Sequence, residues 1–126
     1  MNRCTQKISD QLEVIKKLYQ SVKDATAQLC KNLTMDKVEE VIEERNQLLV
    51  RISAEENLFK KLRVENSLSE DNKIKLSEIR ELIRSIVKLD NTISVLVKHE
   101  MDTVNNELSG FYKTSKAALA YASHRK

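Results

Sequence analysis

The 126-residue chain contains one glycine and no proline, and its 22 basic and 19 acidic residues give a formal net charge of +3 at pH 7. Strand architectures rely on glycine and proline in tight turns, so this composition excludes most sheet proteins and favours an all-α fold. It also excludes phosphate-binding glycine loops, which need several glycines close together, and the small net charge is only a weak signal for nucleic-acid binding.

The first predicted helix covers about residues 3–33. Its apolar side chains follow alternating steps of four and three, which places them on one face that can pack against other helices. This face consists of Ile8, Leu12, Ile15, Tyr19, Val22, Thr26, Leu29 and Leu33. Cys4 and Cys30 lie on the same helix about 39 Å apart, at 1.5 Å per residue, so they cannot form a disulfide. We therefore expect two reduced thiols.

The second predicted helix covers about residues 36–66. Thr34 or Asp36 can accept hydrogen bonds from the first-turn amides, and Asp36 has the spacing of a capping box with the glutamate three residues later. The apolar face of this helix is interrupted by Arg45 and Glu55. Its apolar members are Val38, Val41 or Ile42, Leu48 or Leu49, Ile52, Phe59 and Leu62. Arg45 either pairs with a carboxylate or turns its guanidinium to the edge of the bundle, which is the more common arrangement. The candidate carboxylates are Glu55, Asp90 and Glu100.

The third predicted helix covers about residues 69–108. It starts at Ser69, whose hydroxyl precedes an acidic pair, and both features suit the positive N-terminal end of a helix. Its apolar face consists of Leu76, Ile79, Leu82 or Ile83, Ile86, Leu89, Ile93, Leu96 or Val97, Met101, Val104 and Leu108. Gly110 then allows either a left-handed C-cap or a helix that continues through Tyr121.

Short connections between three long helices predict an antiparallel up-down-up bundle over residues 1–108. At 1.5 Å per residue the third helix is about 60 Å long and the first two are about 45–48 Å, so we expect the last helix to overhang. Residues 109–126 are expected to form a C-terminal helical tail, which carries four basic residues, no acidic residue and three of the five aromatic ones. Unpaired apolar surface is expected at this end.

Residues suited to catalysis or metal binding are few. The two histidines, His99 and His124, lie 25 positions apart and have no cysteine or histidine at ligand spacing, so we expect no metal site. No activated acid, base or nucleophile can be named, and we expect neither enzyme activity nor a cofactor. No segment is apolar enough to span a membrane and the N-terminus lacks a signal peptide, so we expect a cytoplasmic protein without membrane insertion. We also expect no nucleic-acid partner.

Two segments resemble bacterial flagellar export chaperones of the FlgN/FliT type. The first, residues 35–49, opens the second helix with the sequence MDKVEEVIEERNQLL, which contains an E-R-x-x-L-L run. The second, residues 116–122, has the sequence KAALAYA and is similar to a C-terminal element of that family, in which a basic and two small residues precede A/L-Y-G. Length, helix order and the long last helix agree with the family over essentially the whole chain. Ala122 departs from the pattern, since the family often has glycine there.

The resemblance implies a cytoplasmic chaperone that binds terminal segments of late flagellar axial proteins, either hook-filament junction proteins or the filament cap. Such a chaperone prevents premature assembly of these segments and delivers them to the export gate of the flagellar type III secretion apparatus. By this resemblance, Tyr121 corresponds to the tyrosine that docks on the export gate. In the relatives the C-terminal helix can also cover the client face, which makes four further residues candidates for partner binding. These are Leu108, Phe111, Tyr112 and Leu119.

The same apolar faces are compatible with two other kinds of protein. A coiled-coil adaptor or oligomerisation module would use them between chains, form a homodimer and have no defined client. A regulator would sequester another protein in the same groove.

Overall fold

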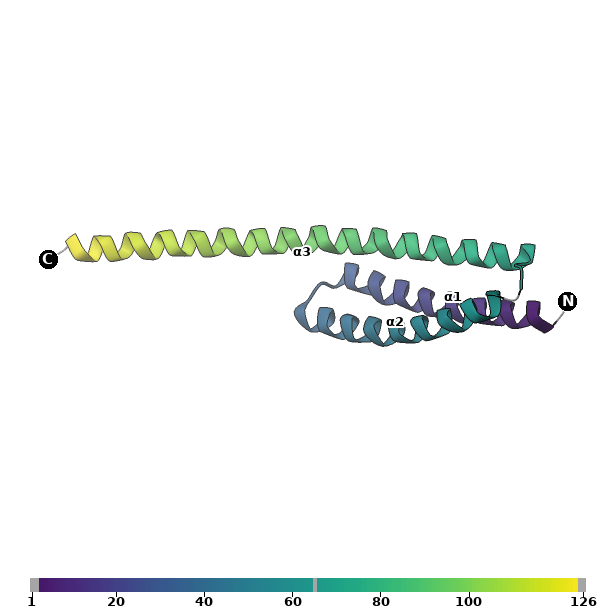
Figure 1. Cartoon of the computed structure of the whole chain (residues 1–126). Helices are drawn as coiled ribbons and strands as arrows, with labels where there is room; N and C mark the ends of the chain where they lie inside the picture. Colours follow the sequence, from purple (N-terminus) through teal and green to yellow (C-terminus); the bar gives the residue numbers. More distant parts are fainter. Residues whose placement is uncertain (1–2, 65, 125–126) are drawn as a thin grey trace. The chain divides into compact units, whose positions relative to one another are not determined.

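A computed structural model describes the backbone of residues 3–64 and 66–124 and the side chains of residues 3–64 and 66–110. Within this part of the chain all regular structure is helical, which confirms the predicted all-α class with three helices (Figure 1). The helices are α1 (Arg3–Lys31), α2 (Met35–Val64) and α3 (Glu70–His124). The observed α1 and α2 end two residues before the predicted ends.

Residue contacts divide the chain into two units. The first unit, Met1–Asn91, contains α1, α2 and the beginning of α3. The second unit, Thr92–Lys126, contains the remainder of α3. The hydrophobic core belongs to the first unit, whereas the sequence-predicted partner-binding residues belong to the second.

Hydroxyl side chains cap the starts of α2 and α3. The Oγ1 atom of Thr34 accepts a hydrogen bond of 3.2 Å from the backbone N–H of Lys37, and Ser69 Oγ accepts one of 3.2 Å from the backbone N–H of Asn72. These bonds satisfy amides that have no partner within the helix. Thr34 is therefore the cap of α2, and Asp36 lies in the first turn, where its charge suits the helix dipole.

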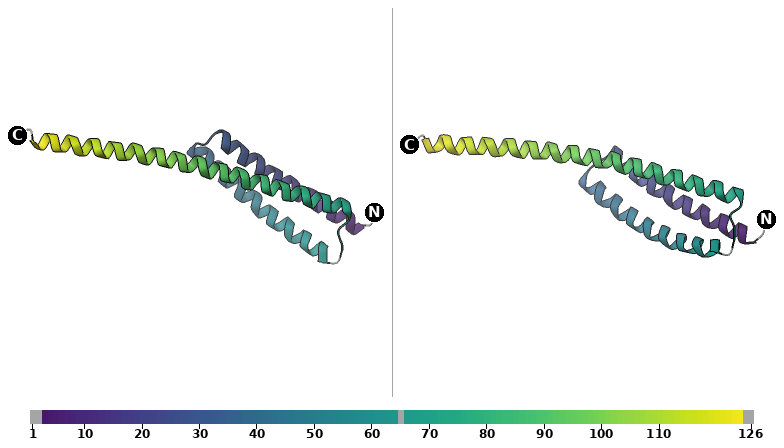
Figure 2. Two further views of the ribbon diagram at one scale, coloured as in Figure 1. Left: turned by 90° about the horizontal axis from the view of Figure 1, so that it is seen from above. Right: turned by 45° about the horizontal axis from the view of Figure 1, so that its top comes forward.

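The core of the first unit contains side chains from all three helices, which lie side by side in it (Figure 2). Both of its buried clusters draw on α1, α2 and α3, so the first unit is a helical bundle. One cluster consists of Ile8, Leu12, Ile15, Phe59 and Ile79. The other consists of Leu18, Val22, Ile52 and Ile86.

The charged residues that interrupt the apolar face of α2 both have partners across the bundle. Arg45 donates two hydrogen bonds to Asp90 on α3, of 2.7 Å from Nη1 to Oδ1 and 3.1 Å from Nη2 to Oδ2. Glu55 accepts hydrogen bonds from the side-chain amide of Gln11 on α1, at its carboxylate and at its backbone carbonyl. The guanidinium of Arg45 thus pairs with a carboxylate instead of turning to the edge, since a bidentate partner lies within reach on α3.

Gly110 does not end the third helix. It is helical, without a positive φ angle, and α3 continues through it to His124. A glycine inside a helix costs about 1 kcal/mol relative to alanine, which is too little to end a helix that has no proline nearby. The left-handed C-cap is therefore not formed, and residues 109–124 belong to α3.

Replacing Gly110 with alanine is expected to stabilise α3 locally. A Cβ atom at this position would meet no atom within 4 Å, so the substitution brings no clash. The gain of about 1 kcal/mol should slow amide hydrogen exchange near residue 110 roughly fivefold. The matched control is Ser109→Ala, which changes helix propensity by only about half as much. Equal or faster exchange in Gly110→Ala would contradict the prediction.

Candidate protein-binding surface

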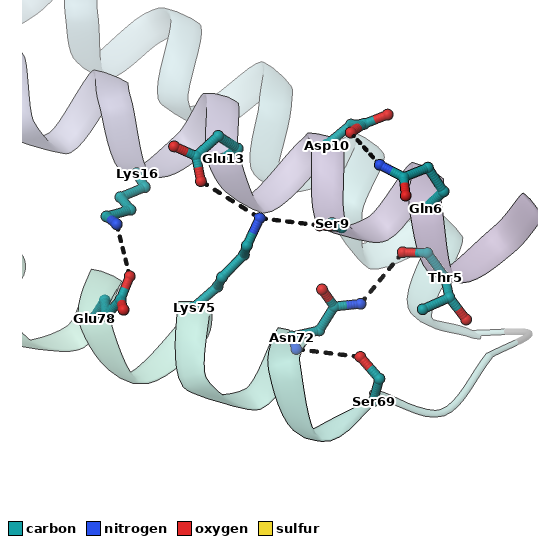
Figure 3. A network of polar contacts seen from close by, with 10 residues as sticks. All are labelled: Thr5, Gln6, Ser9, Asp10, Glu13, Lys16, Ser69, Asn72, Lys75 and Glu78. Atoms are coloured by element: carbon teal, nitrogen blue, oxygen red, sulfur yellow. Dashed lines mark hydrogen bonds and ion pairs between the residues drawn. The ribbon is translucent and has the colours of Figure 1, made fainter. Parts of the chain in front are cut away.

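A network of polar contacts joins the beginning of α3 to α1 (Figure 3). The buried Asn72 donates from Nδ2 to the backbone carbonyl of Thr5 over 3.4 Å. One turn later, Lys75 Nζ donates to Ser9 Oγ over 3.0 Å and lies 3.5 Å from a carboxylate oxygen of Glu13. These contacts attach α3 to α1 beside the apolar core.

Lys16 and Glu78 extend the same network, with 2.7 Å between Nζ and Oε2. The hydrogen bond to Glu78 raises the pKa of Lys16 above its usual 10.5, because it favours the charged ammonium. A groove of about 440 Å³ runs beside this pair, lined by Ile74 and Leu82 among others. Lys16 and Lys75 each pair with a glutamate, so these charges hold α1 and α3 together and are not left for recognition of a charged ligand.

Tyr19 on α1 makes another of the polar contacts inside the first unit. Its hydroxyl donates a hydrogen bond of 2.5 Å to Oε1 of Glu56 on α2. Burial, this hydrogen bond and the negative charge of Glu56 raise the pKa of Tyr19 well above its usual 10. The folded protein therefore holds the phenolic proton more tightly than the unfolded chain does.

We expect this proton to make stability depend on pH in alkaline solution. The stabilisation that the protonated Tyr19 contributes is fully present below about pH 10, where the tyrosine of the unfolded chain is also protonated. It is lost progressively as the pH rises above that value, because the unfolded chain then releases the proton more readily than the folded protein does. Tyr19→Phe should remove the part of the alkaline loss of stability that comes from ionisation of Tyr19. Urea unfolding followed by circular dichroism from about pH 8 to about pH 11 measures both proteins. Glu56→Gln should lessen this loss of stability, since it keeps an acceptor for the tyrosine hydroxyl and removes the charge that raises the pKa of Tyr19. Identical pH dependence in wild type and Tyr19→Phe would contradict the assignment.

The second unit carries an exposed apolar stripe on α3, which we call the α3 face and define as Val97, Met101, Val104 and Leu108. These residues are 37–60% exposed. Their spacing of four, three and four places them on one side of the helix. The apolar periodicity that predicts the bundle core thus continues into residues whose side chains are open to solvent.

A shallow hollow of about 370 Å³ lies at the beginning of the α3 face. Apolar atoms form most of its wall, and Lys98 and Asp102 contribute charged groups. The lining residues are Ile93, Ser94, Val97, Lys98, Met101, Asp102 and Asn105. Such a surface suits an apolar side chain of a protein partner with polar groups around it.

Exposed aliphatic residues in the first unit have a different explanation. Ile42 and Leu49 on α2 are exposed, but each follows a residue that is more buried, Val41 and Leu48. Single exposed aliphatic residues at the edge of a packed helix are normal in proteins. On the α3 face, by contrast, four successive positions of the apolar stripe are exposed together.

Of the sequence-predicted partner-binding residues, Leu108 lies on the α3 face and is exposed. The side chains of Phe111, Tyr112, Leu119 and Tyr121 lie outside the described residues, although their backbones belong to α3. The other members of the α3 face were predicted as part of the apolar stripe of the third helix and not as binding residues. The signal that pointed to them was the length of that helix relative to the first two.

The chain matches no protein-family model, no curated protein and no solved structure. Within the described residues, no three His, Cys, Asp or Glu side chains are grouped so that they could hold a metal ion. Helices in the same part of the chain are also too polar or too short to cross a membrane.

Proposed function

We propose that the protein is an export chaperone of the flagellar FlgN/FliT type. In this role it binds terminal segments of hook-filament junction or filament cap proteins in the cytoplasm, prevents their premature assembly and delivers them to the export gate. The observation that carries the proposal is the α3 face, with its four exposed apolar residues at helical spacing. An amphipathic client helix can bury its own i, i+3, i+4 and i+7 side chains against such a face.

The first unit acts in this proposal as an up-down-up antiparallel bundle. This order is supported by Gln11 near the start of α1, which bonds to Glu55 near the end of α2. It is also supported by Arg45 in the first half of α2, which bonds to Asp90 at the end of the first unit. The buried apolar residues described for this bundle lie between Ile8 and Ile86, whereas the α3 face is exposed and is assigned to the client.

The C-terminal part of α3 has a separate task in the proposed mechanism. Residues 109–126 carry four basic residues and no acidic one, and they contain Tyr121 in the segment that resembles the gate-docking element. Tyr121 is assigned to the export gate, whereas Leu108 on the α3 face is assigned to the client. Client and gate then bind to neighbouring segments of the same helix.

The test is affinity capture from a lysate of the source bacterium, with bound proteins identified by mass spectrometry. The baits are the full chain, a chain ending at Ser109, and the double variant Val104→Asp with Leu108→Asp. The full and shortened chains should both capture hook-junction or cap proteins, and only the full chain should capture the export-gate protein. The double variant should lose at least about nine-tenths of the client, because buried carboxylates without partners oppose binding.

Val95→Asp is the matched control, since Val95 is exposed on a different side of α3. It should retain the client. Capture of the bait alone, or of proteins unrelated to the flagellum, would contradict the chaperone proposal and favour the coiled-coil adaptor. Equal client recovery with the double variant would remove the α3 face from the proposal.

A further inference from the structure

The apolar spacing of the α3 face continues beyond Leu108 in the sequence. Steps of four and three from Val97 define eight positions in one helical stripe, from residue 97 to residue 122. The first four positions hold the α3 face. The next four hold Phe111, Ser115, Ala118 and Ala122. This average period of 3.5 residues is the pattern of helices that pair in a coiled coil.

The stripe is symmetric about a point between Ser109 and Gly110. If a second copy runs in the opposite direction, every position meets another position of the stripe, and large residues meet mostly small ones. The four pairs are Val97 with Ala122, Met101 with Ala118, Val104 with Ser115, and Leu108 with Phe111. Alternating large and small residues fill the space between two helices evenly. A parallel arrangement would instead pair serine or alanine with the same residue of the other copy at three of the eight positions.

Charge distinguishes the two directions further. Residues 100–107 contain Glu100, Asp102 and Glu107 and no basic residue, whereas residues 112–119 contain Lys113 and Lys116 and no acidic residue. An antiparallel pair sets the acidic segment of each copy against the basic segment of the other, twice. A parallel pair would set like charges side by side, which is unfavourable.

We propose that two copies of this chain associate through antiparallel pairing of α3 over residues 97–122. The pair buries the α3 face of each copy and matches acidic with basic segments at both ends. This association does not depend on the chaperone function, because it follows from the stripe and the charges of α3 alone.

Charge-reversal variants test the pairing. Lys113→Glu with Lys116→Glu makes this part of α3 acidic, and Glu100→Lys with Glu107→Lys makes it more basic. Sedimentation equilibrium should find a dimer for the wild type and a dissociation constant raised at least about tenfold for each variant alone. An equimolar mixture of the two variants should restore the dimer, because every charged segment then faces one of opposite sign. A monomeric wild type, or variants that dimerise as the wild type does, would overturn the proposal.

Disulfide formation tests the direction. In a chain with Cys4→Ser and Cys30→Ala, Met101→Cys and Ala118→Cys are introduced into separate proteins. A mixture of the two should form a disulfide between chains under mild oxidation, and neither should do so alone, since antiparallel pairing separates each residue from its own copy by about 25 Å along the axis. Val95→Cys, on a different side of the helix, should form none with either protein. Disulfides of Met101→Cys with itself would show a parallel pair and overturn the proposal.

Discussion

Replacing Leu12 with alanine is expected to lower the free energy of unfolding of the first unit by about 2–5 kcal/mol. Leu12 is 0% exposed and belongs to the buried cluster that joins α1, α2 and α3. The loss combines the transfer energy of the removed methyl groups with the cavity that remains when the neighbours relax only partly. A domain of this size has a total stability of about 5–15 kcal/mol, so the variant loses a large fraction of it.

The measurement is urea and thermal unfolding followed by circular dichroism. The midpoint temperature of Leu12→Ala should fall by at least about 8 °C. Val14→Ala is the matched control, because Val14 lies on the same helix and is 39% exposed, and it should change the free energy by less than about 1 kcal/mol. A Leu12→Ala protein with the midpoint of the wild type would contradict the observed packing of α1.

Replacing Arg45 with methionine is expected to lower the free energy of unfolding by about 1–2 kcal/mol. Hydrogen bonds to charged groups contribute about 1.5–3 kcal/mol, and solvent screening reduces this value because the side chains of Arg45 and Asp90 are 24% and 39% exposed. The bidentate geometry makes this pair more favourable than an ordinary surface ion pair. Methionine keeps much of the apolar stem, so the variant mainly reports the lost polar contact.

A double-mutant cycle with Asp90→Asn isolates the interaction between the two side chains. The two substitutions together should cost less than the sum of their separate effects, because either one alone already removes the charge pair. Arg51→Met is the control on the exposed side of α2 and should stay within about 0.5 kcal/mol of the wild type. Strict additivity between Arg45→Met and Asp90→Asn would show that the contact contributes nothing to stability.

The client proposal and the dimer proposal concern the same α3 face. A client that buries Met101 and Leu108 would displace the second copy, since one apolar stripe cannot be covered twice. The apparent affinity for a client then falls as the concentration of the chain rises, because less of the protein has a free face. Dimerisation would keep this apolar surface out of water while no client is bound.

The sequence by itself determined the features that depend on neighbouring residues. The apolar spacing of α1 identified Ile8, Leu12 and Val22 as core residues, and all three are buried. The hydroxyl of Ser69 identified the start of α3. Helical periodicity and capping act over a few residues, so their signals are complete within a short stretch of sequence.

Only the tertiary structure decided the features that depend on how helices are rotated against each other. The sequence left Val41 and Ile42 as equal candidates for the core, and the rotation of α2 buries Val41 and exposes Ile42. For the guanidinium of Arg45 the sequence left three candidate carboxylates or the edge of the bundle. The position of α3 places Asp90 within hydrogen-bond distance of it. The length of the third helix predicted unpaired apolar surface near its C-terminal end, but the spacing alone describes a covered stripe and an open one equally well. The structure shows that the four residues of the α3 face are the exposed ones. Periodicity identifies which side chains share a side of a helix, and only the surrounding helices decide whether that side is buried.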